Sequence, residues 1–474
     1  MESGLEKRKN LLFVFADQWR RAALGAYHGD PVRTPRMDAF AEEGTVFENG
    51  VSACPLCSPA RASMLTGKDP LATGVFTNCK PGTSIRLRDE EVCIADVLKP
   101  LGYQTGYIGK WHLDESELNY NPAPASGAKD WDAYTPPGPR RHGFDFWHSY
   151  GACDRHLHPH YWENTPERLQ FDQWSPEHET DVALDFLRGL DRENPFCLFI
   201  SWNPPHSPYD QVPEKYLDLY REQEIHFRGN VIPHDLHTHT YETFGYTPET
   251  LREATRQYYA EVSGLDDQFG RLMDGLRALG LEEDTYVVVT ADHGDMLGSH
   301  GMMAKHVWHE ESIGVPLLLR GPGVPRRRCN TVVSTPDLAP TLLALMGAPV
   351  PAAMQGSDLS RMILEGGEEP RAAYLCACPG RDVFLQAFRE AGKSPLDYGW
   401  RALRTETHTY VVEVGYDVTP KLHRLLYDLQ ADPLQQHPLA IEKPEENPLT
   451  ARFEEQLRRW MRESGDGFLQ HLEP

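Results

Sequence analysis

One segment of the chain combines a cysteine, a proline and an arginine at a spacing that could position a nucleophile. It reads Cys57-Ser58-Pro59-Ala60-Arg61 and is followed by Thr66-Gly67. Ser58 can cap a helix and Pro59 can start one, which predicts that Cys57 lies against a helix N-terminus. Free backbone N–H groups there favour an anion, and Arg61 adds a fork of donors suited to a tetrahedral oxyanion. The segment therefore predicts a reactive group beside an oxyanion-binding site.

Two other interpretations of Cys57 compete with this one. With Cys54 it forms a Cys-x-x-Cys pair, which occurs in zinc sites and in redox pairs. No second pair with that spacing completes a zinc site, because the nearest candidate, Cys376-x-Cys378, is distant and differently spaced. An inert buried thiol is the remaining alternative.

Polar side chains follow four short apolar segments that have the composition of buried strands. The segments are Leu11–Phe15, Tyr103–Ile108, Phe196–Trp202 and Thr285–Thr290, and behind them come Asp17-Gln18, Lys110-Trp111-His112, His206 and Asp292-His293-Gly294-Asp295. The carboxyl ends of parallel strands share one edge of a sheet, where ligands bind. A single Asp-His pair is equally consistent with a solvated loop, but four such clusters together predict one site.

Four of these side chains have the chemistry of a metal shell. Asp17, Gln18, Asp292 and His293 offer hard oxygens and one imidazole nitrogen, a donor set that suits a divalent cation. In the alternative interpretation Asp17 only caps a helix and Gln18 lies at the surface.

The order of the expected elements is that of an α/β protein with a large, mostly parallel or mixed sheet flanked by helices. A further strand is expected at Val315–Leu319, and helices at 35–44, Glu177–Leu190, Pro248–Leu279 and Asp337–Met346. After a linker at 366–370 come strand patterns at Trp400–Arg404 and His408–Val414 and a helix near Thr450–Met461. We therefore expect a catalytic domain over residues 1–365 and a smaller antiparallel-sheet domain over 366–474. Two long irregular segments, Asp114–Trp174 and Glu222–Tyr246, are expected to be functional or disordered.

Charge and cysteine usage narrow the class of protein. The 474 residues carry a formal net charge of −23, which argues against a nucleic-acid partner or an anionic membrane surface. The N-terminus lacks the apolar run and cleavage site of a secretory signal, and no stretch has the length of a membrane span. The nine cysteines are irregularly scattered, which favours reduced thiols. These features predict a cytoplasmic location.

Taken together, the motifs resemble those of the formylglycine-dependent sulfatases of the alkaline-phosphatase-like superfamily. The resemblance rests on the Cys57 segment, on Gly109-Lys110-Trp111-His112-Leu113, on Pro205-His206-Ser207-Pro208 and on Asp292-His293-Gly294-Asp295, in the family's order. Lys305 lies where the family keeps an active-site lysine. The resemblance implies an alkaline-phosphatase-like fold and hydrolysis of a sulfate ester, either a carbohydrate O-sulfate or an aryl sulfate.

The resemblance also implies a role for each motif residue. Cys57 would be oxidised to formylglycine by a formylglycine-generating enzyme, and its hydrate would bind the metal together with Asp17, Gln18, Asp292 and His293. Lys110 and Arg61 would hold sulfate oxygens, and Lys305 with His206 would neutralise and protonate the leaving oxygen. His112 would deprotonate the remaining hydroxyl so that sulfate is released.

Two positions of the predicted metal shell depart from the family pattern. Gln18 stands where many members have an aspartate, and His293 where many have an asparagine. Calcium is the family expectation, but the nitrogen ligand makes manganese an alternative. The same pairings are found in phosphonate monoester hydrolases, so hydrolysis of a phosphonate monoester or phosphodiester is the alternative function. Lys110-x-His112 favours sulfate.

The Asp130–Trp162 loop is rich in aromatic and cationic side chains and is expected to contact a sulfated sugar. Arg155, His156, His158 and Trp162 are its candidate substrate-binding residues. A solvated loop or a dimer contact is the alternative interpretation, and an oligomer is compatible with the sequence.

A non-catalytic binding protein with an unmodified Cys57 is a third hypothesis for the function. The presence of Lys110, His112, His206 and Lys305 argues against it, because a protein without activity does not need them.

Overall fold

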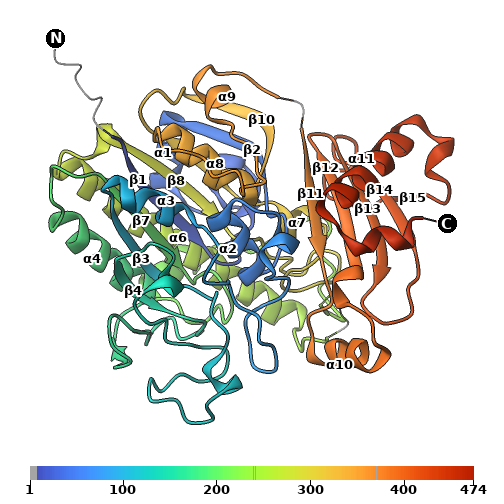
Figure 1. Ribbon diagram of the computed structural model, residues 1–474, viewed down its shortest axis with the longest axis horizontal. Coiled ribbons are helices and arrows are strands. Elements are labelled where there is room, and N and C mark those ends of the chain that lie inside the picture. Colours follow the sequence, from blue (N-terminus) through green and yellow to red (C-terminus); the bar gives the residue numbers. More distant parts are fainter. Residues whose placement is uncertain (1–7, 239, 241, 370, 474) are drawn as a thin grey trace.

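Two large β-sheets, a small two-stranded sheet and the helices packed on them form the molecule (Figure 1). The computed structural model describes residues 8–473 apart from 239, 241 and 370. Pro370 of the expected linker and the first seven residues therefore lie outside the described residues. None of the described helices is long and apolar enough to cross a membrane.

The larger sheet has eight strands in the order β10-β2-β9-β8-β1-β7-β3-β4. Its strands are β1 (Asn10–Ala16), β2 (Thr45–Val51), β3 (Gln104–Lys110), β4 (Phe146–Tyr150), β7 (Phe196–Trp202), β8 (Thr285–Ala291), β9 (Leu317–Arg320) and β10 (Arg327–Ser334). Only β9 runs antiparallel to its two neighbours; the other pairs in this sheet are parallel. The strands expected at the centre are confirmed, because continuous apolar runs can be buried on both faces of such a sheet.

Helices cover both faces of this sheet (Figure 1). They are α1 (Pro35–Glu43), α2 (Cys57–Thr66), α3 (Ile94–Leu98), α4 (Ser175–Arg188), α5 (Glu214–Leu217), α6 (Pro248–Ala278), α7 (Glu310–Ile313), α8 (Thr335–Leu345) and α9 (Ser360–Leu364). Alternate residues of β1 point to opposite faces: Leu12 and Val14 pack into the core with α1, α4 and α6. Leu11 and Phe13 pack into the core with α2, α3 and α8. The central strands are therefore buried against helices on both faces of the sheet.

The smaller sheet is antiparallel and follows the chain order. Its strands are β11 (Ala372–Ala377), β12 (Gly399–Thr405), β13 (His408–Gly415), β14 (His423–Asp428) and β15 (Leu439–Ala440), and its helices are α10 (Asp382–Ala391) and α11 (Pro448–Ser464). One face packs on α11 through Phe453 and Leu457. The other face, with Trp400 and Val411, packs against Trp308 and Ile313 of the larger unit.

Several details differ from the sequence-based expectation. Helix α2 begins at Cys57 with Leu56 as its N-cap, so Ser58 is not the cap. Instead the Ser58 hydroxyl donates to the carbonyl of His112, which ties α2 to the loop after β3 (2.7 Å). Strands β2, β4 and β10 were not expected. The irregular segment after β3 contains β4 and a two-stranded sheet of β5 (His160–Tyr161) and β6 (Leu169–Gln170).

Candidate active site

Four neighbouring parallel strands deliver the predicted site residues to one edge of the larger sheet. In the central part of the sheet, β8, β1, β7 and β3 are adjacent. Ala16 of β1 is paired with Ala291 of β8 and Trp202 of β7, so the residues that follow each strand start side by side. The edge predicted from the sequence is therefore present in the structure.

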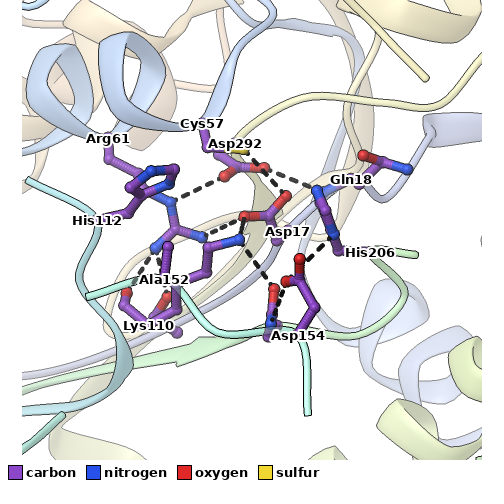
Figure 2. Close-up of polar contacts among 12 residues, drawn as sticks. Asp17, Gln18, Cys57, Arg61, Lys110, His112, Ala152, Asp154, His206 and Asp292 are labelled. Carbon is purple, nitrogen blue, oxygen red and sulfur yellow. Dashed lines mark hydrogen bonds and ion pairs between the residues drawn. The ribbon is translucent and has the colours of Figure 1, made fainter. Parts of the chain in front are cut away.

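Arg61 lies behind two buried carboxylates and binds both of them (Figure 2). Its Nε donates to Asp292 Oδ2 at 2.9 Å and its Nη2 to Asp17 Oδ2 at 3.0 Å. Its Nη1 donates to the backbone carbonyl of Lys110 and to the Ser201 hydroxyl. Arg61 is only 1% exposed, so the structure gives it the role of orienting carboxylates. The direct contact with sulfate expected from the resemblance stays a prediction.

Each of these carboxylates turns its other oxygen toward Cys57 and His293. Asp17 Oδ1 is 3.5 Å from Cys57 Sγ and 3.5 Å from His293 Nε2. Asp292 Oδ1 accepts the backbone N–H groups of Gln18 and His293 and is 3.6 Å from His293 Nε2. One donor atom from each of Asp17, Cys57, Asp292 and His293 lies within 4.8 Å of the others, and all four residues are buried.

This donor set fits a divalent cation. His293 Nδ1 hydrogen-bonds to the Gly294 carbonyl, which places the proton on Nδ1 and leaves the Nε2 lone pair facing the two carboxylates. Burial also lowers the pKa of His293, so the imidazole is neutral as a ligand must be. Two carboxylate oxygens and one imidazole nitrogen are ligands that calcium or manganese accepts.

The Gln18 side chain takes a different direction from the other predicted metal ligands. Its Oε1 accepts a hydrogen bond from Lys305, and its Nε2 donates to Asp295 Oδ2 at 2.8 Å and to the Tyr209 hydroxyl. The side-chain amide of Gln18 thus bridges Lys305 and Asp295. A bond from Gln18 to the metal stays a prediction.

Cys57 is held as a protonated thiol. Burial, reinforced by the neighbouring Asp17 carboxylate, raises the pKa of Cys57 to about 12. A thiol in that state is a poor nucleophile at neutral pH. The position of Cys57 at the start of α2 is as predicted, but its chemistry as an unmodified cysteine is weak.

Lys110 and His112 lie beside Cys57, and all three residues line one cavity. Lys110 Nζ binds Asp17 Oδ2 at 2.7 Å and Asn203 Oδ1 at 3.0 Å. His112 Nε2 lies 3.1 Å from the Cys79 carbonyl, while its buried Nδ1 has no hydrogen-bond partner among the described residues. Burial lowers the pKa of His112, and the arrangement leaves Nδ1 as a free acceptor for a proton.

His206 and Lys305 lie in contact, as expected for two residues that the resemblance assigns to the same leaving oxygen. Lys305 Nζ lies 2.9 Å from His206 Nε2, and His206 Nδ1 donates to the Ser207 carbonyl. Burial, followed by the charge of Lys305, lowers the pKa of His206 to about 3. The neutral imidazole accepts from Lys305, which leaves the ammonium as the proton donor of the pair.

Three polar residues of the site were not singled out from the sequence. Asp154 and Asn203 hold Lys110 and His206 in place, because Asn203 Nδ2 donates to Asp154 Oδ1 and Asp154 lies 3.5 Å from His206 Nδ1 (Figure 2). Ser201 accepts from Arg61. Asn203 directly follows β7 and could have been found by the same strand-end rule that predicted His206. Asp154 lies in an irregular segment and had no such signal.

A cavity of about 700 Å³ opens onto these groups. Six Lys and Arg residues line it, against four Asp and Glu, although the chain as a whole is strongly acidic. Of the four substrate-binding residues predicted in the Asp130–Trp162 loop, only Arg155 lines it. His156 is buried with Nε2 at the His206 carbonyl, and His158 is exposed and pairs with Asp172. Trp162 is fully buried in the small core of the loop.

Comparison with known proteins assigns the chain to a family. Residues 9–348 match the sulfatase family. The chain belongs to the sulfatase family. An ulvan-active sulfatase of Formosa agariphila is 35% identical over 469 residues, which cover 97% of this chain and 82% of that relative. An endo-4-O-sulfatase of Bacteroides thetaiotaomicron is 32% identical over 474 residues, with 92% of this chain and 89% of the relative covered.

A solved structure extends the likeness to the whole fold of this sulfatase. A sulfatase from Bacteroides fragilis superposes with a TM-score of 0.86 at 32% identity, and the match covers 100% of both chains. Family and fold together identify the chain as a hydrolase of sulfate esters, with a large mixed sheet and a C-terminal antiparallel sheet as expected from the sequence.

Proposed function

We propose that this sulfatase hydrolyses a carbohydrate O-sulfate, and aryl sulfates as well, with a nucleophile made by oxidation of Cys57 to formylglycine. The observation that carries the proposal is the position of Cys57, which lines the cavity and shares a buried cluster with Asp17, Asp292 and His293. The saccharide part is supported by the ulvan-active and endo-4-O-sulfatase relatives. The modification makes a formylglycine-generating enzyme a partner during maturation.

Two groups would complete the site. A hydrated aldehyde at residue 57 supplies a hydroxyl nucleophile, and a divalent metal supplies charge that favours its ionised form. Asp17, Asp292 and His293 would hold the metal, with Gln18 as a further candidate ligand. Calcium suits the carboxylates, and manganese is the alternative because of the imidazole nitrogen.

The remaining residues act on sulfate and on the leaving alcohol. Lys110, which is ion-paired with Asp17, lines the cavity and would neutralise a sulfate oxygen. Lys305 would donate a proton to the leaving oxygen, and His206 would hold the Lys305 ammonium in position. His112 Nδ1 would take the proton of the second hydroxyl of the hydrated aldehyde, since its Nε2 is already engaged by Cys79. Loss of that proton would re-form the aldehyde C=O bond while the bond from the same carbon to the sulfated oxygen breaks, and sulfate would leave with that oxygen.

Peptide mass spectrometry on protein made in a host with the modifying enzyme tests the nucleophile. We expect an aldehyde at Cys57, sulfate release from sulfated monosaccharides, and loss of nearly all turnover in Cys57→Ala. Circular dichroism of that variant should match the parent, because one residue at the start of α2 adds little to the core. Full activity from protein that carries only the thiol would refute the nucleophile.

Leaving-group dependence tests the roles of Lys305 and His206. Sugar alkoxides are poor leaving groups and need a proton, whereas nitrophenolate does not. We therefore expect Lys305→Ala to reduce kcat/KM for a sugar sulfate by about 10²- to 10³-fold more than for nitrophenyl sulfate. An equal loss on both substrates would contradict a proton donor at this position.

A phosphonate assay on the same preparation tests the alternative function. Phosphonate monoesters carry one negative charge, as sulfate monoesters do, so the choice between them depends on the wall of the cavity. We expect a higher kcat/KM for a sulfated hexosamine than for a phenyl phosphonate ester. A clear preference for the phosphonate would overturn the proposal.

A further inference from the structure

Of the four Lys and Arg residues that line the cavity outside the proposed chemistry, two have unpaired side chains within the described residues. Lys129 and Arg155 line the cavity, and neither side chain has a hydrogen bond or ion pair within the described residues. Both lie in the long segment between β3 and α4 and both are exposed. Elsewhere the exposed basic residues of this acidic chain are commonly paired, as Arg221 is with Glu214 and Asp218.

An exposed indole lines the same cavity. Trp131 lines the cavity and is 41% exposed, although the other nine tryptophans of this protein are buried. Its ring centroid is 6.0 Å from that of His112, and Lys80 Nζ lies 6.0 Å from the indole centroid. The indole is therefore held next to the proposed base, where a flat apolar surface can carry the ring of a bound sugar.

The carboxylates of the cavity do not neutralise Lys129 and Arg155. Asp132 is bound to His160 and to three backbone N–H groups, and Asp154 is bound to Asn203. Glu242 lies 3.8 Å from Arg381, whose guanidinium also donates to Thr240. Asp130 is the remaining acidic residue that lines the cavity, and its side chain makes no hydrogen bond or ion pair in the described part of the chain.

We infer that Lys129, Trp131 and Arg155 form a second subsite, which binds a sugar ring carrying a further sulfate or carboxylate group. The inference rests on the proposed function, because it places the scissile sulfate at Cys57 and the neighbouring sugar on Trp131. The substrate class is then a polyanionic oligosaccharide rather than an isolated monosaccharide sulfate. A cavity of about 700 Å³ has room for such a ligand.

Binding to the Cys57→Ala variant tests the subsite without any turnover. The probe is a tetrasaccharide of alternating uronate and hexosamine that carries one sulfate, measured by isothermal titration calorimetry. In that background we expect Lys129→Ala and Arg155→Ala each to weaken binding about threefold to fivefold, with a shallower dependence on salt. Arg192→Ala is the matched control, because Arg192 is an exposed, unpaired cation in the turn between α4 and β7, away from the cavity.

Variants at two further positions test the sign of the charge effect and the need for a flat ring. Asp130→Asn should strengthen binding, because it removes an unpaired negative charge beside Lys129. Trp131→Ala should weaken binding about threefold to tenfold, and Trp131→Phe should retain most of the affinity because a flat ring remains. Two altered probes separate the two sources of the second anion. A carboxyl-reduced tetrasaccharide should bind more weakly if the subsite recognises the uronate. A disulfated tetrasaccharide should bind more tightly if the subsite recognises a second sulfate.

The outcome is separable from the proposed function. Affinities that change no more in Lys129→Ala and Arg155→Ala than in Arg192→Ala, or a monosaccharide sulfate that binds as tightly as the tetrasaccharide, would overturn the subsite. Failure of the modified protein to release sulfate from any sugar would instead refute the proposed function. Circular dichroism of each variant confirms that the altered side chain, and not unfolding, is measured.

Discussion

The inner and the outer parts of the cavity are built in different ways. The inner part takes Asp17, Lys110 and Asp292 from the ends of central strands. Arg61 pairs with both carboxylates and Lys110 pairs with Asp17, all at distances of 3.0 Å or less. The outer part takes Lys129 and Arg155 from irregular chain, and their charges are unpaired among the described residues.

This difference assigns different tasks to the two parts. Buried charges need partners, because an unpaired charge in the interior costs several kcal/mol. The inner groups are therefore fixed before substrate arrives, as chemistry on a sulfate ester demands. The outer cations remain solvated and can be lost or exchanged at little cost to the fold, which suits the recognition of variable sugars.

Removal of the metal should have the largest effect and should affect the inner part alone. We expect dialysis against a chelator to lower kcat by about 10³-fold or more, since the charge on the nucleophile and on sulfate is then uncompensated. Calcium should restore activity, and manganese a measurable fraction. Turnover that survives in metal-free protein, verified by elemental analysis, would contradict the assignment of Asp17, Asp292 and His293.

Replacement of Arg61 should destabilise the whole protein. Arg61→Met leaves the buried Asp292 without its cation and Asp17 with Lys110 alone, and we expect a loss of about 3–5 kcal/mol in the free energy of unfolding. Urea denaturation followed by fluorescence measures it, with Lys129→Ala as the control from the outer part, expected within about 0.5 kcal/mol of the parent. Similar effects of the two variants would remove the distinction between paired and unpaired regions.

A largely buried cluster of Glu310 with Arg404 and Arg21, at the boundary with the smaller sheet, should give a pH-dependent effect of intermediate size. Burial alone would raise the pKa of Glu310, but Arg404 and Arg21 lower it to about 2, below its ordinary value of 4.5. Because the folded pKa is the lower one, this stability is present above about pH 4.5 and is lost as the pH falls toward 2. Between pH 6 and pH 3.5 the parent should lose about 1 kcal/mol more than Glu310→Gln in urea titrations. Equal losses in both proteins would show that Glu310 does not titrate with folding.

The exposed pair of the outer loop should have the smallest effect. His158 Nδ1 lies 2.7 Å from Asp172, but both side chains are largely exposed. We expect His158→Ala to change stability by less than about 0.5 kcal/mol and to leave saccharide binding unchanged. A marked loss of binding would restore His158 as a substrate contact and would extend the outer subsite beyond Trp131.

The central strands and the polar residues that follow them could be predicted from the sequence, because each is marked by a short run of neighbouring residues. Phe196–Trp202 is an unbroken apolar run, and its bounds agree with β7. Strands β2 and β10 could not be found in this way, because Glu48, Asn49 and Arg328 are poor strand formers by composition. They become strands by pairing with each other across more than 270 residues of sequence.

The sequence by itself determined which chemistry is available: a cysteine at the start of a helix, carboxylates and histidines at neighbouring strand ends, and a lysine for the leaving group. Only the tertiary structure decided which loop residues face that chemistry. Trp131 and Trp162 lie in the same irregular segment, yet the first lines the cavity and the second is buried. Residues in irregular segments have no periodicity that marks one face as buried, so their orientation is set by packing against distant parts of the chain.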